Sequence, residues 1–102
     1  PIGLNTKTWR YLEPIFEALQ QAQQQTGRFK FYDYSAAVYR TFKEWNDLGI
    51  SKKMARQLVK YFKAPSRKGT SPVRTLIDAT FPDLDPKQKS RWSRALEYAA
   101  LR

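Results

Sequence analysis

The sequence predicts a single all-α domain of about five helices. Apolar residues recur at helical spacing in successive segments, and Ser, Gly and Pro residues that favour helix ends stand between these segments. Two strands that would pair with each other are not evident. A chain of 102 residues is long enough for one small core, which buries roughly 60% or more of the unfolded surface. The domain is expected to span residues 1–102, and the start at Pro1 leaves open that the chain is a fragment of a longer protein.

The first helix is expected at residues 7–26, with Gly27 as its C-cap. Pro14 allows two arrangements, because proline has no N–H to donate and its ring clashes with the preceding turn. We expect Pro14 to open the main helix after a short turn. The alternative is one longer helix that is kinked at Pro14. The inward positions keep helical spacing and are Trp9, Leu12, Ile15, Phe16 and Leu19.

Residues 28–34 alternate between charged and aromatic side chains, which is the period of a strand. A lone strand would leave its backbone groups unpaired, so we expect an extended connector that packs Phe29 and Phe31 onto the helices. The alternative is that these aromatic side chains stack on nucleobases. Ser35 is expected to cap the next helix, over residues 35–48. Its inward stripe contains Val38, Phe42 and Trp45.

A sharp turn separates this helix from a helix expected at 51–63. Gly49 is able to adopt the positive φ that ends a helix, and Ser51 is expected to cap the helix that follows. The helix at 51–63 has two different faces. The apolar face consists of Met54, Ala55, Leu58, Val59 and Phe62. The opposite face consists of Lys52, Lys53, Arg56, Lys60 and Lys63, with Gln57 beside them.

The rest of the chain is expected to form a loop and two helices. Residues 64–71 are rich in Pro, Gly and Ser, and they form a basic loop that contains Arg67 and Lys68. Ser71 followed by Pro72 is the pattern of an N-cap and a first helical residue. It opens a short helix at 72–80 whose inward residues are Val73, Leu76 and Ile77.

The same pattern opens the last helix, over residues 86–101. Asp85 precedes Pro86, and Gln88 stands at the capping-box position. The helix is expected to close the core with Trp92, Ala95, Leu96 and Ala99. The charged residues are expected largely on its other sides, and they are Lys87, Lys89, Arg91 and Arg94.

Positive charge is concentrated in one quarter of the chain. The sequence has 19 Lys and Arg residues against nine Asp and Glu, which gives a net charge of +10. Residues 49–77 contain eight of the cations and no acidic residue. A solvated helix face normally mixes both signs, whereas Lys and Arg that neutralise phosphates release counterions and so drive binding to nucleic acids. The acid-free run therefore predicts nucleic-acid binding.

Residues 41–60 resemble the helix-turn-helix of transcription regulators and related DNA-binding domains. The resemblance rests on Leu48-Gly49-Ile50-Ser51, followed by Ala55 and Leu58 at inward positions. It implies that the helix at 51–63 enters the major groove of DNA, with base contacts from its first two turns.

Two residues depart from that pattern. Trp45 stands where a small residue normally lets the two helices approach, and Glu44 stands where an apolar residue is usual. The helix crossing is therefore expected to differ from the usual one.

Charge and resemblance together give a set of candidate contacts. Lys53, Arg56 and Gln57 are the candidates for base reading, because arginine suits guanine and glutamine suits adenine. Lys60 and Lys63 are expected to contact phosphates. With the basic loop 64–72 included, the candidate set is Lys52, Lys53, Arg56, Gln57, Lys60, Lys63, Arg67, Lys68 and Arg74.

The predicted function is the binding of double-stranded DNA, either in transcription regulation or as the DNA-binding part of a larger protein of replication, partition or recombination. RNA is an alternative partner, although no signature of an RNA-binding module is visible. A protein-interaction module whose basic face binds an acidic partner is the second class of function, and exposed Trp or Tyr rimmed by Arg would favour it. Membrane attachment is not expected, because its lipid side would be the apolar face that the core needs.

The sequence contains no cysteine and no histidine. This excludes disulfides, zinc fingers and catalysis by Cys or His, and no metal site or cofactor is expected. Asp83 and Asp85 stand beside prolines, where capping explains them. The isolated domain is expected to have no catalytic activity. Neither a long apolar run nor a signal peptide is visible, so we expect an intracellular location, in the cytoplasm or with the nucleoid or nucleus.

Overall fold

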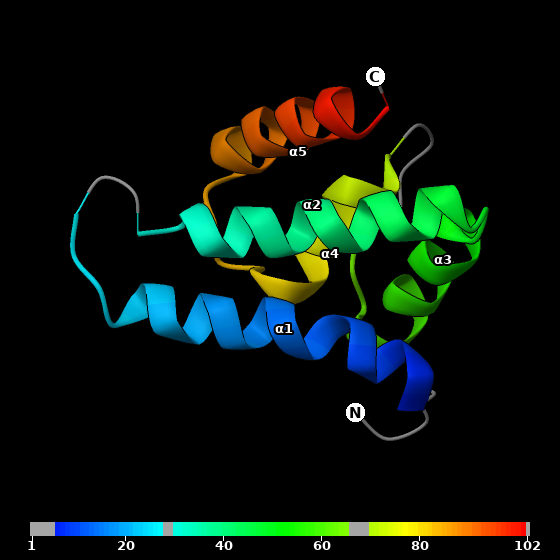
Figure 1. Cartoon of the computed structure of the whole chain (residues 1–102), viewed down its shortest axis with the longest axis horizontal. Coiled ribbons are helices and arrows are strands. Elements are labelled where there is room, and N and C mark those ends of the chain that lie inside the picture. Colours follow the sequence, from blue (N-terminus) through cyan, green and yellow to red (C-terminus); the bar gives the residue numbers. More distant parts are fainter. Residues whose placement is uncertain (1–5, 28–29, 66–69, 102) are drawn as a thin grey trace.

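The computed structural model describes residues 6–27, 30–65 and 70–101. The described residues form five helices and no strand, which confirms the predicted all-α fold (Figure 1). The predicted extended packing of Phe29 lies outside the described residues. The helices are α1 (Thr6–Gln23), α2 (Tyr32–Asp47), α3 (Ser51–Phe62), α4 (Pro72–Thr80) and α5 (Pro86–Ala100).

The short helix α4 is the centre of the fold. It contacts each of the other four helices, and Figure 1 shows it in the middle of the molecule, between α1 and α5. Two buried threonines satisfy their hydroxyl groups within the helix, because Thr75 Oγ1 donates to the carbonyl of Ser71 and Thr80 Oγ1 donates to that of Leu76. The buried residues of α4 are Val73, Thr75, Leu76, Ile77, Asp78, Ala79 and Thr80.

Aromatic side chains form a large part of the core. Tyr34 and Trp45 are fully buried, and Trp45 meets the ring of Tyr11 at right angles, with 5.6 Å between the ring centroids. Phe31 packs on Phe81 and on the last helix, as predicted for this residue. Large rings fill much of the volume that Ile, Leu and Val fill in most small domains.

Helix α1 is continuous through Pro14, so the expected separate turn before that residue is wrong. Pro14 is exposed, and the carbonyl of Arg10 that it leaves without an N–H partner belongs to an exposed residue. The inward stripe continues on both sides of the proline and includes buried Leu12 and Ile15. Burial of this whole stripe outweighs the roughly 3 kcal/mol that a proline costs inside a helix. The helix ends at Gln23, and Gly27 beyond it has a positive φ of 114°.

Two predicted serine caps are wrong, and one is confirmed. Helix α2 begins at Tyr32, so Ser35 lies in its first turn, where its N–H donates to the carbonyl of Phe31. Helix α3 has Ile50 at its N-cap position, and Ser51 is its first residue. By contrast, Ser71 accepts a hydrogen bond from the N–H of Arg74 at 3.2 Å, with Pro72 at the start of α4. The residues at the first two N-cap positions are Phe31 and Ile50, and neither makes a capping hydrogen bond through its side chain.

Asp85 occupies the N-cap position of α5, but its side chain makes no capping hydrogen bond. The buried face of this helix is also rotated from the predicted one. Ala95 and Ala99 are exposed, while Lys89, Ser93 and Ala100 are buried, with Trp92 and Leu96 half-buried. The predicted outward position of Lys89 is therefore wrong. The rotation brings this lysine to a carboxylate on α4, as described below.

Leu58 on α3 is fully buried and packs in the core. We expect Leu58→Ala to lower the free energy of unfolding by about 2 to 5 kcal/mol, because the truncation leaves a cavity that the core does not refill. Urea denaturation followed by circular dichroism measures this change. Leu101→Ala, the same truncation at an exposed leucine, is the control. Equal stability of the Leu58 and Leu101 variants would show that α3 turns a different face to the core.

Candidate nucleic-acid interface

The basic residues of α3 lie on its solvent side. The inward side is anchored by buried Met54 and Leu58. Lys63 stands at the C-cap with a left-handed backbone, φ 55°. We call the solvent side the α3 basic face, and it consists of the exposed residues Lys52, Lys53, Arg56, Lys60 and Lys63.

The α3 basic face has no acidic partner among the ion pairs of the described residues. Those pairs are formed by Lys43 with Asp47, and by Arg74 and Lys89 with Asp78. Within the face, Lys60 Nζ lies 5.3 Å from the ring centroid of the adjacent Tyr61. Five cations on one helix repel one another, and a polyanion relieves that repulsion.

The turn before α3 consists of Leu48, Gly49 and Ile50. Gly49 has a φ of 72°, as predicted, and the N–H of Ile50 donates to the carbonyl of Trp45 at 2.9 Å. Trp45 itself is fully buried. Helix α3 packs more extensively on α4 than on α2. The large indole at the end of α2 and the support from α4 together set the position of α3.

Gln57 points toward α1 and is only half-exposed. Its Oε1 accepts a hydrogen bond of 2.8 Å from the hydroxyl of Thr8. This contact ties α3 to α1 and occupies the carbonyl that a bidentate contact with adenine would need. Of the three predicted base readers, Lys53 and Arg56 are the two that are exposed.

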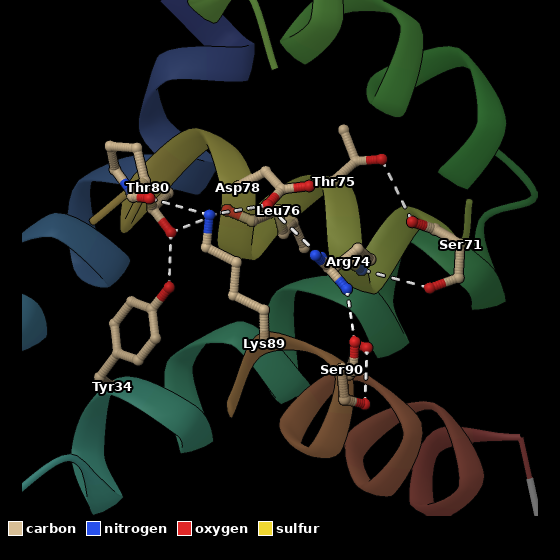
Figure 2. A network of polar contacts seen from close by, with 11 residues as sticks. Tyr34, Ser71, Arg74, Thr75, Leu76, Asp78, Thr80, Lys89 and Ser90 are labelled. Carbon is tan, nitrogen blue, oxygen red and sulfur yellow. Dashed lines mark hydrogen bonds and ion pairs between the residues drawn. The ribbon is translucent and has the colours of Figure 1, made fainter. Parts of the chain in front are cut away.

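Arg74 does not belong to the α3 basic face. It lies on α4, where its Nε is 3.4 Å from Asp78 Oδ1 and its Nη1 donates to Ser90 Oγ at 2.9 Å (Figure 2). The guanidinium thus bridges α4 and α5 and is already bonded at two of its nitrogens. The last two predicted contacts, Arg67 and Lys68 of the basic loop, lie outside the described residues.

Asp78 and Lys89 form a buried ion pair that the sequence analysis did not identify. Lys89 Nζ is 3.0 Å from Asp78 Oδ1 and also donates to the carbonyl of Pro82 at 2.9 Å. Figure 2 shows the side chain of Lys89 reaching from α5 toward Asp78 on α4. The available signal was the position of Asp78, the single acid of α4, which directly follows the apolar pair Leu76 and Ile77 and ends the acid-free segment.

A buried chain of hydroxyl groups completes the network around α4. The hydroxyls of Tyr34 and Thr80 are 2.7 Å apart, and Thr80 donates its proton to the carbonyl of Leu76. Because Thr80 has only one hydroxyl proton, Tyr34 is the donor to Thr80. Tyr34 therefore needs its proton in the folded state. Burial, with a further contribution from the charge of Asp78, raises the pKa of Tyr34 well above its ordinary value.

The described part of the chain contains no group of three or more acidic residues that is able to hold a metal ion. None of its helices combines the length and the apolar character that are needed to cross a bilayer. Comparisons with protein-family models, with curated proteins and with solved structures gave no match to this chain.

Asp78→Asn should destabilise the fold strongly, because it leaves the buried ammonium of Lys89 without a counter-charge. Loss of one partner from a buried pair costs about 3 to 5 kcal/mol. Urea denaturation measures the effect, and Asp47→Asn, in an exposed ion pair, is the control. The double variant Asp78→Asn/Lys89→Met should be more stable than Asp78→Asn, since it removes the unpaired charge. A double variant that is less stable would contradict this account.

The raised pKa of Tyr34 predicts a loss of stability at alkaline pH. Above about pH 10 the unfolded chain releases this proton while the folded chain keeps it. The free energy of unfolding should then fall by about 1.4 kcal/mol per pH unit from this group alone. Tyr34→Phe should be less stable than the parent by about 1 kcal/mol near neutral pH.

The difference in free energy of unfolding between the parent and Tyr34→Phe should shrink above about pH 10. Urea denaturation across this pH range tests the prediction. Tyr32→Phe, the same change at an exposed tyrosine, should leave the pH dependence of the parent unchanged. Parallel pH profiles of parent and Tyr34→Phe would show that Tyr34 ionises in the folded state.

Proposed function

We propose that this domain binds double-stranded DNA through the α3 basic face. The observation that carries the proposal is the set of five exposed cations on one helix, within a segment of 29 positions, 49–77, that contains no acidic residue. Each Lys or Arg that neutralises a phosphate releases a counterion, and this release is the main sequence-independent source of affinity for DNA.

The dimensions of α3 suit the major groove. Its 12 residues span about 18 Å at 1.5 Å per residue, and the groove is about 12 Å wide and admits one helix. The core lies on the opposite side of α3, at Met54 and Leu58, so the basic face can approach DNA without local unfolding. We assign Lys53 and Arg56 to base edges and Lys60 and Lys63 to phosphates, on the helix-turn-helix pattern. Catalysis is not part of the proposed function.

The α3 basic face favours an acidic protein partner less than it favours DNA. Interface hot spots are enriched in Trp, Tyr and Arg. Trp45 is buried, Trp9 and Trp92 are half-buried, and Tyr61, the tyrosine of α3, is half-buried as well. In the described part of the chain, the exposed large apolar residues lie on α2, on the turn before α3, and on and just after α5. The α3 basic face thus offers charge without an exposed aromatic anchor.

The proposal is tested by two alanine variants on α3. A preferred duplex is first selected from a random library, and its affinity is compared with that of a random duplex. Arg56→Ala should weaken binding to the preferred duplex by about 1 to 3 kcal/mol more than binding to the random duplex, because a bidentate contact to guanine is lost. Lys60→Ala should weaken both duplexes alike and reduce the salt slope of log K by about one unit.

Lys43→Ala on α2, which removes one exposed lysine outside the α3 basic face, is the matched control. The parent is also titrated with single-stranded RNA and with heparin at several salt concentrations. Equal affinity for duplex, RNA and heparin would show that the domain binds polyanions through charge alone and does not recognise DNA. Unchanged duplex binding by both α3 variants would remove α3 from the interface and favour the acidic protein partner.

A further inference from the structure

A second basic surface lies on α5. Its exposed cations Lys87, Arg91 and Arg94 follow the spacing i, i+4, i+7 and therefore share one side of the helix. They point outward because the other side of α5 is held in the core by Lys89, which is bound to the buried Asp78. We call this surface the α5 groove, an open depression of about 690 Å³ lined by Pro86, Lys87, Ser90, Arg91 and Arg94.

The charge of the α5 groove is of one sign, because no acidic side chain is among the described residues that line it. A second depression of about 880 Å³ adjoins it and shares Pro86, Ser90 and Arg94 with it. Of the two acids that line this second depression, Asp78 is already paired with Lys89 and Arg74, and Glu97 is the other. The α5 groove is thus lined by cations alone, whereas the second depression has three cations against two acids.

The second depression connects the α5 groove with the segment that follows α3. Pro65 lines it together with Arg94, and Pro65 is two residues beyond Lys63, the last cation of the α3 basic face. The second depression therefore extends from the α5 groove to within two residues of the end of the α3 basic face.

The spacing of the cations favours a polyanion over a single small anion. From Lys87 to Arg94 the helix rises by seven residues, or about 10 Å, so these charges do not converge on one point. One strand of DNA carries a phosphate about every 3.4 Å along the duplex axis. Phosphates along a nucleic-acid strand likewise follow one another and do not converge on one point.

Ser90 adds a neutral donor to the α5 groove. Its Oγ accepts the hydrogen bond from Arg74 Nη1, and its own hydroxyl proton remains available for a phosphate oxygen. Arg74 is then a positioning residue, which orients Ser90 from α4. Arg74 is a cation of the acid-free run, yet it faces Ser90 on α5 and does not belong to the α3 basic face.

From these observations we infer that the α5 groove is a second contact surface for the sugar–phosphate backbone of the duplex that α3 binds. The inference rests on the proposed function, and it adds a site on a different helix. Lys87, Arg91 and Arg94 contact phosphates, and Ser90 donates a hydrogen bond to a phosphate oxygen. These contacts carry no sequence information and fix the orientation of α3 on the DNA.

The first test compares two variants that each lose two charges. Arg91→Gln/Arg94→Gln alters the α5 groove, and Arg40→Gln/Lys43→Gln removes two exposed cations from α2. Glutamine keeps the helix propensity in both, and circular dichroism confirms folding. For random duplex DNA, the groove variant should lose about tenfold in affinity at physiological salt and about two units of salt slope. The α2 variant should lose much less of both.

The second test uses the unaltered chain, so it does not depend on the folding of any variant. Lysines are acetylated with and without saturating duplex DNA, and the modification of each lysine is followed by mass spectrometry. Lys53, Lys60 and Lys87 should all be protected by DNA, while Lys43 on α2 should react as before. A parallel sample contains inorganic pyrophosphate in place of DNA and should leave Lys87 reactive.

The outcomes separate the two proposals. Protection of Lys53 and Lys60 without protection of Lys87, or equal losses in the two double variants, would overturn the inference about the α5 groove and leave the proposed function standing. Absence of duplex binding by the unaltered chain would overturn both. Full protection of Lys87 by pyrophosphate would identify a small-anion site and overturn the assignment to the nucleic-acid backbone.

Discussion

The carboxylate of Asp78 is the constraint on which the arrangement of the helices depends. It is buried in the central helix α4, and a charge in that position requires a counter-charge and hydrogen bonds. Lys89 and Arg74 supply them from one side of α5 and from the next turn of α4. The rotation of α5 about its own axis follows, because Lys89 must face inward. That rotation turns the opposite side of α5, with its three cations, to solvent.

The same pairing organises the surface charge. Asp78, the first acid after the acid-free positions 49–77, is buried and neutralised by Lys89 and Arg74, so it offers no exposed charge to the other cations of that segment. The two basic surfaces then lie on helices that α4 holds together, with α3 on one side and α5 on the other. One acid therefore lies in the core, while the α3 basic face and the lining of the α5 groove contain cations and no acidic residue.

Elements with a strong local signal could be predicted from the sequence, and elements decided by packing could not. The positive φ of Gly49, the cap at Ser71 and the inward position of Leu58 follow from residue types and spacing alone. Ser35 and Ser51 are good caps in isolation, yet tertiary contacts moved both helix starts. Lys89 was expected on the outside because a lysine is buried favourably only when it has a partner of opposite charge. That partner, Asp78, lies 11 positions earlier, and helical spacing within α5 does not reveal that the two residues face each other.

The left-handed backbone of Lys63 shows where this fold is not optimised for stability. A residue with a Cβ atom loses roughly 1 kcal/mol in that conformation, and glycine is the usual occupant of such a helix end. A lysine there keeps an exposed charge at the end of the α3 basic face, where backbone preference alone would favour glycine. Selection for a high melting temperature would replace this residue early, whereas selection for binding would retain it. The identity of residue 63 in a related chain thus reports which of the two pressures was stronger.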